Sequence, residues 1–270
     1  MGEGIAVARP EGALAIVLGI SQLLYLVTVL TLGVRLMLLA HRTRKLPESF
    51  LAAHFVLCCG FGYLLLAISL PASHQPGLLP QQVIAPMSGV GHLLSCLGVF
   101  GGVCFNYLVF RRKQAWALGL VWLSAVTLTT GYVGYGLTGG FSHGRFAGLW
   151  FWLFYGTYIA AAAWVMVEPF HYHRVMRRRL RLGLADPLVV NRFILWGSGS
   201  VCRFVMLVTG GVSGSLYQHI SPELWPSVTW WTFIAVAIAG FGLSVTYWLT
   251  FFPTRAYVRL VTERHSPVGG

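Results

Sequence analysis

Charged residues are scarce in this chain. Of its 270 residues, 10% are Asp, Glu, Lys or Arg, whereas about 25% is usual for a soluble domain. Apolar residues make up 56% of the chain, and the mean hydropathy is +0.71. A soluble fold of this composition has too few polar groups to cover its surface, and a disordered chain is far less apolar. The composition therefore excludes a cytosolic enzyme and a disordered protein, and it indicates a polytopic membrane protein.

Cysteine is also rare, and it is absent from the polar connections. The five cysteines all lie within long apolar segments: Cys58, Cys59, Cys96, Cys104 and Cys202. The disulfide frameworks of secreted modules are far denser in cysteine. The sequence thus excludes a disulfide-rich secreted module, and we expect these cysteines to serve as small packing residues.

Long apolar runs are abundant. A hydrocarbon core about 30 Å thick requires roughly 20 apolar residues per helix. Seven segments meet this requirement, at about 13–39, 50–70, 82–110, 115–137, 148–170, 188–212 and 225–252. We predict an all-α bundle of seven transmembrane helices, which forms a single transmembrane domain over residues 1–270 with no soluble domain. The lipid bilayer is its first predicted partner.

Positive charge is distributed regularly along the chain. There are 19 Lys and Arg against seven Asp and Glu, a formal net charge of +12. Every second connection and the C-terminal tail are basic, through Arg42, Arg44 and Lys45, then Arg111, Arg112 and Lys113, then Arg174, Arg177, Arg178, Arg179 and Arg181, and finally Arg255, Arg259 and Arg264. The alternate connections hold Arg145 alone, and the N-terminal tail holds Arg9. Because cytoplasmic loops are enriched in Lys and Arg, we predict an outside N-terminus, a cytoplasmic C-terminus and no nucleic-acid partner.

The third apolar segment carries small residues along one face. Gly91, Ser95, Gly98 and Gly102 recur at helical spacing. Small residues allow helix backbones to approach closely inside a membrane. We therefore expect this helix to lie at the centre of the bundle, crowded on that face.

Ionisable side chains inside the predicted spans are few, and burying charge there is costly, so they are functional candidates. Arg203 lies in the sixth segment and His92 in the third. Counted from the segment ends at about 1.5 Å per residue, both fall in the outer half at similar depth. Tyr132 and Tyr155 are polar groups at related depths. We predict that these four side chains line a pocket for a small ligand.

No acidic residue is placed to pair with Arg203. Glu168 is the one acidic residue inside a predicted segment, and it lies near the inner end of the fifth. Arg203 must therefore contact helix carbonyls, tyrosines, water or an anionic ligand, which leaves a structural role as the alternative. The alternative for His92 is a neutral, packed histidine.

A second polar group lies at the inner end of the fifth segment. Glu168, His171 and His173 offer a carboxylate and two imidazoles that could bind a metal. Pro169 disturbs the helix between them, so an interfacial anchor is the favoured interpretation, and we predict no metal and no cofactor. The arginines that follow are Arg174, Arg177, Arg178, Arg179 and Arg181. They could attract anionic lipid or a cytoplasmic protein, although their role as a topology signal is explanation enough.

Seven helices with an outside N-terminus resemble microbial rhodopsins and G-protein-coupled receptors in topology. Retinal requires a Schiff-base lysine in the last helix. The two lysines, Lys45 and Lys113, both lie in connections, so a retinal protein is excluded. The ends of the third and last segments also lack the receptor motifs. Ser213 lies in a Gly-x-Ser-Gly run that resembles the rhomboid nucleophile motif, but no intramembrane histidine follows it.

Three local runs resemble a family of bacterial seven-helix membrane proteins. They are RTRKLPE at 42–48, LADP at 184–187 with NRF at 191–193, and FFP at 251–253. Together they cover most of the predicted cytoplasmic face. The resemblance implies a multi-pass protein of the bacterial inner membrane, and it implies no particular activity.

Four functions are compatible with the sequence. The favoured one is a receptor-like or sensory protein that binds a small ligand through Arg203 and His92 and engages a cytoplasmic protein partner. The second is a transporter or channel for a small anionic or polar solute, although the chain has no internal repeat. The third is a membrane enzyme, for which no nucleophile–base pair is evident, and the fourth is an assembly subunit.

Overall fold

The computed structural model describes residues 12–74, 77–144, 146–216, 220–221 and 223–263. Its elements in the described part are α1 (Ala13–Thr43), α2 (Leu46–Ala53), the π-helical η1 (His54–Gly62), α3 (Tyr63–His74), α4 (Gln81–Asn106), the π-helical η2 (Tyr107–Arg111), α5 (Ala115–Leu137), α6 (Gly140–His143), α7 (Leu149–Arg181), α8 (Pro187–Leu216), α9 (Trp225–Phe251) and α10 (Arg255–Glu263). Arg9, Arg145 and Arg264 of the topology argument lie outside the described residues.

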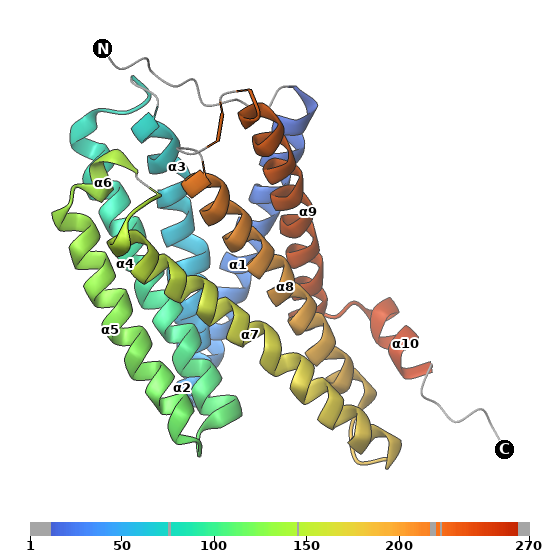
Figure 1. The fold of residues 1–270 in the computed structure, drawn as a ribbon. Coiled ribbons are helices and arrows are strands. Elements are labelled where there is room, and N and C mark those ends of the chain that lie inside the picture. Colours follow the sequence, from blue (N-terminus) through green and yellow to red (C-terminus); the bar gives the residue numbers. More distant parts are fainter. Residues whose placement is uncertain (1–11, 75–76, 145, 217–219, 222, 264–270) are drawn as a thin grey trace.

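Seven helical spans in the described residues are long and apolar enough to cross a membrane, which confirms the predicted number and the all-α class. Two of them are composite. The segments α2, η1 and α3 form one span, Leu46–Ser73, and α4 continues through η2 to Arg111. The spans lie beside one another and alternate in direction (Figure 1).

Helix α7 is longer than the predicted segment 148–170. It continues through Pro169 and ends at Arg181, and α8 begins at Pro187. The apolar segment ends near residue 170, but the helix continues, because a proline removes one backbone hydrogen bond without ending a membrane helix when neighbouring groups compensate. Helices α7 and α8 run obliquely across the other helices in Figure 1, as spans longer than the bilayer thickness commonly do.

Helix α4 is the central helix of the bundle, as its small-residue face predicts. In its most apolar stretch 61% of the residues are buried, against at most 39% in the other spans. A Cβ atom on Gly98 would lie 2.4 Å from the Cys58 backbone nitrogen, and one on Gly102 would lie 2.7 Å from the His54 ring. The small face of α4 therefore admits η1 at close range.

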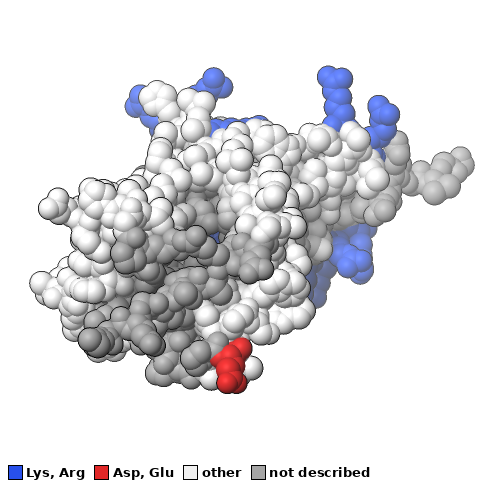
Figure 2. Space-filling model, turned by 90° about the horizontal axis from the view of Figure 1, so that it is seen from above, with Lys and Arg blue, Asp and Glu red and all other residues white. Residues whose placement is uncertain are grey.

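The Lys and Arg residues gather at one end of the bundle, here called the basic end. It comprises the α1–α2, η2–α5 and α7–α8 connections and the α9–α10 region. Figure 2 looks onto the opposite end, where most of the described surface is uncharged, acidic colour appears at its lower edge and basic side chains project at the margins. The nine-residue helix α10, which was not predicted, leaves the bundle sideways near the basic end (Figure 1) and contacts α8.

Candidate functional site

Arg203 lies in the interior of the bundle, where α8 faces η1 and α9. Its side chain is 9% exposed, and the Cys59, Cys58, Tyr25 and Tyr247 side chains surround its guanidinium group. Its Nη1 contacts His54 Nε2, and its Nη2 donates a hydrogen bond to Cys58 Sγ at 3.4 Å. Elements far apart in the sequence therefore meet at one cation.

The hydrogen bonds of His54 define its tautomer. Nδ1 lies 2.7 Å from the Gly98 carbonyl oxygen of α4. A carbonyl can only accept, so Nδ1 carries the proton, and Nε2 of the neutral ring is left with a lone pair. That lone pair accepts the Arg203 N–H.

The positive charge of Arg203 has no carboxylate partner among the described side chains. The interior carboxylate, Glu168, accepts hydrogen bonds from Arg111 Nε at 2.7 Å and from Trp164 Nε1 at 2.9 Å. The described side chains that interact with the Arg203 guanidinium are instead the His54 imidazole, the Cys58 and Cys59 thiols, and the Tyr25 and Tyr247 phenols. Because an unpaired buried charge is costly, these residues form the strongest candidate site in the chain, and we call Arg203, His54 and Cys58 the arginine centre.

His92 lies in a different cluster. Its ring packs against Phe154 at a centroid distance of 5.2 Å, Tyr135 at 5.6 Å and Phe141 at 5.8 Å. Both ring nitrogens are buried, and neither has a hydrogen-bond partner in the described residues. These contacts are those of a packed histidine in an aromatic cluster, which was the alternative stated for it.

The expected common depth of His92 and Arg203 is not observed. His92 contacts Phe154 of α7, and the adjacent Tyr155 hydroxyl donates to the Leu207 carbonyl of α8 at 2.8 Å. His54, which contacts Arg203, bonds to the Gly98 carbonyl of α4, so His92 lies about 9 Å along α4 from that level, at about 1.5 Å per residue. Counting residues from the segment ends gave the wrong depth for Arg203, because α8 is oblique and its first turns lie beside the basic end of α7.

Tyr132 and Tyr155 both connect helices through backbone carbonyls. The Tyr132 hydroxyl donates to the Gly89 carbonyl at 3.2 Å. The Tyr155 ring fills the space above Gly211, where an added Cβ would lie 2.2 Å from it. These two tyrosines pack against the same hydrophobic cluster as Cys58 of the arginine centre, but their hydroxyls bond to backbone carbonyls rather than to Arg203.

The three metal candidates do not converge. Glu168 bonds to Arg111 and Trp164, His173 Nδ1 lies 3.0 Å from the Val190 carbonyl, and the exposed His171 packs beside Tyr172. In the part of the chain that the structure describes, no three His, Cys, Asp or Glu side chains are arranged to hold a metal ion. The arginines Arg174, Arg177, Arg178, Arg179 and Arg181 are all exposed at the end of α7.

We expect Glu168→Gln to lower the free energy of unfolding by about 1–2 kcal/mol, because it removes the buried charge that neutralises Arg111. The Glu168 side chain is 3% exposed and that of Arg111 is 23% exposed, so the arginine is partly hydrated after the loss. Denaturant unfolding of the purified variants in detergent measures the change. Glu48→Gln in the first turn of α2 is the matched control, and an equal loss in both variants would contradict the expectation.

Two functional candidates were missed from the sequence. His54 was not among the candidates named from the sequence, and the structure places it in contact with Arg203. Arg35 in α1 was overlooked. It donates to the Phe251 carbonyl at 2.6 Å and its guanidinium carbon lies 4.6 Å from the Phe252 ring centroid, so it secures the end of α9.

No family model, curated protein or solved structure compared with the chain matches it.

Proposed function

We propose that this seven-helix membrane protein is a receptor-like, sensory protein that binds a small anionic ligand at the arginine centre. The observation that carries the proposal is a buried guanidinium with no carboxylate partner among the described side chains. An anion bound there would supply the missing countercharge, and charge-assisted hydrogen bonds to a guanidinium are among the strongest that proteins form. Differential stabilisation by such a ligand can shift a conformational equilibrium.

The position of Arg203 suits a sensory role. It bonds to η1, and through His54 it is coupled to the Gly98 carbonyl of α4. An anion on the guanidinium would compete with His54, and the loss of that contact would free η1 to move relative to α8. π-Helical segments such as η1 occur frequently at functional sites, which supports this assignment.

The proposal differs from the sequence-based one in the residues that touch the ligand. Arg203 remains the principal contact, with His54 and Cys58 beside it. His92, Tyr132 and Tyr155 are assigned to the packing of the neighbouring aromatic cluster. The positive-inside rule places the basic end in the cytoplasm, and the exposed arginines at the end of α7 are the proposed docking site of a cytoplasmic protein partner.

A ligand-dependent stability assay tests the proposal. The purified full chain in neutral detergent is heated with acetate, succinate, sulfate or inorganic phosphate. We expect at least one anion to raise the melting temperature by about 5 °C near 100 times its Kd. Arg203→Gln should abolish this shift, because Gln retains polarity and loses the charge.

Arg35→Gln is the matched control, since it removes an arginine from a spanning helix outside the arginine centre and should retain the shift. Equal shifts in both variants would reject Arg203 as the anion site. If the same anion accumulated inside proteoliposomes, the transporter alternative would replace the receptor-like one.

A further inference from the structure

A groove opens between α1 and the start of the second span at the basic end. It has a volume of about 510 Å³ and is lined by Met37, Ala40, His41, Arg44, Ser49, Ala52, Ala53, Val56 and Leu57. This volume is within the range of pockets that bind small molecules, about 300–1,000 Å³. The groove is separate from the arginine centre and shares none of its three residues.

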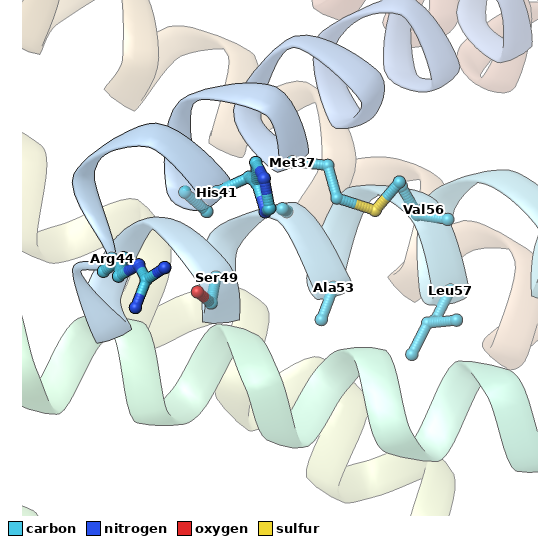
Figure 3. A pocket seen from close by; sticks show the side chains of 9 residues that line it. Met37, His41, Arg44, Ser49, Ala53, Val56 and Leu57 are labelled. Carbon is cyan, nitrogen blue, oxygen red and sulfur yellow. The ribbon is translucent and has the colours of Figure 1, made fainter.

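The lining changes character along the groove (Figure 3). Arg44, Ser49 and His41 lie at one end, and Val56 and Leu57 lie at the other. At the apolar end the helices converge, because a Cβ on Gly33 of α1 would lie 2.7 Å from the Val56 side chain. The groove is thus polar and basic at its mouth and apolar toward the middle of the two spans.

The backbone of the α1–α2 connection presents Arg44 at this mouth. Arg44 adopts a left-handed conformation with φ of 52°, which ordinary side chains adopt rarely. Its backbone N–H caps α1 through a 2.8 Å hydrogen bond to the Ala40 carbonyl. Glu48 is not part of the groove, and its carboxylate accepts a hydrogen bond from Thr43. No ion pair joins Glu48 to Arg44 in the described residues.

We propose that this groove binds one anionic phospholipid from the bilayer leaflet at the basic end. Its phosphate would bond to the Arg44 guanidinium, with the His41 imidazole and the Ser49 hydroxyl as further donors. One acyl chain would lie against Met37, Val56 and Leu57.

Three observations favour a membrane lipid as the occupant. Both walls of the groove belong to spanning helices, so it opens into the bilayer. Met37 is 53% exposed, which leaves the apolar half accessible from the lipid side. Basic pockets between spanning helices at the cytoplasmic side are known to select anionic head groups, and the charge of Arg44 matches a phosphate.

Native mass spectrometry of the purified full chain tests this proposal, with dioleoyl phosphatidylglycerol as the anionic probe and dioleoyl phosphatidylcholine as its neutral counterpart. We expect one phosphatidylglycerol to bind more tightly than phosphatidylcholine. Arg44→Gln should weaken its binding about fivefold, the factor expected for one basic residue at a lipid head group. Arg42→Gln is the matched control, because it removes an arginine in the last turn of α1 that does not line the groove, and it should leave the Kd unchanged.

A second variant tests the acyl-chain half. Met37→Trp fills the groove from an exposed position, so it should lower the affinity for both lipids without altering the melting temperature. Equal losses in Arg44→Gln and Arg42→Gln would overturn the head-group assignment, as would equal affinity of the wild type for the two lipids. Unchanged binding in a folded Met37→Trp protein, or full competition by glycerol 1-phosphate alone, would overturn the lipid as occupant.

Discussion

Replacing His54 by leucine should lower the free energy of unfolding by about 3 kcal/mol, because it removes the acceptor of a buried guanidinium. Leucine has nearly the volume of histidine, so the loss reports the polar contact rather than a cavity. The Gly98 carbonyl would lose its donor at the same time. Denaturant unfolding in mild detergent, followed by tryptophan fluorescence, measures the change.

The double variant His54→Leu/Arg203→Met separates the charge from the packing. Removing both partners of a buried polar contact can be nearly neutral, whereas removing one leaves the other unsatisfied. We therefore expect the double variant to recover most of the stability lost in His54→Leu. If the double variant were less stable than His54→Leu, the guanidinium would have to be satisfied by groups other than His54.

The second large effect is expected at Gly98, where α4 meets η1. A Cβ there would lie 2.4 Å from the Cys58 backbone nitrogen and 2.6 Å from its Cβ. The obstacle is largely backbone, which cannot rotate away, so Gly98→Ala must separate the two helices. Such overpacking commonly costs about 1–3 kcal/mol. We expect a loss at the upper end of this range, because the separation also lengthens the hydrogen bond from His54 to the Gly98 carbonyl.

Gly119→Ala is the control for Gly98→Ala. Nothing lies within 4 Å of a Cβ built on Gly119 of α5, and alanine favours a helix over glycine by about 1 kcal/mol. The control should therefore unfold at an equal or higher denaturant concentration than the wild type. A Gly98→Ala protein as stable as Gly119→Ala would show that α4 and η1 are not in close contact.

The sequence predicted the helices well because membrane insertion depends on local composition. Each segment of about 20 apolar residues is recognisable by itself, and the small face of the third segment marked α4 as central. The predicted helices differ from those of the structure at two places, where composition and proline are poor guides to helix ends. Pro169 lies inside α7, and residues 255–263, which have no long apolar run, form α10.

The sequence also indicated Arg203 as a candidate site residue, since an arginine within a long apolar segment is recognisable without a structure. It did not identify the neighbours of Arg203. His54 is separated from Arg203 by 149 positions, and the proximity of the two depends on how far each helix extends toward the basic end. The structure places His54, rather than His92, against Arg203, because helix tilt changes which positions share a depth.

By itself, the sequence determined that this protein has seven spanning helices, that its positive charge lies at alternate connections, and that one buried arginine has no acidic partner to meet. These properties belong to single residues and short segments, because the transfer of each segment into lipid is an almost independent event. The contact of Arg203 with His54, the place of His92 in an aromatic cluster and the position of Arg44 at the mouth of a groove became visible in the folded bundle alone. Those contacts depend on helix tilt and on the close approach that Gly33 and Gly98 permit, and these are set by steric fit between segments far apart in the chain.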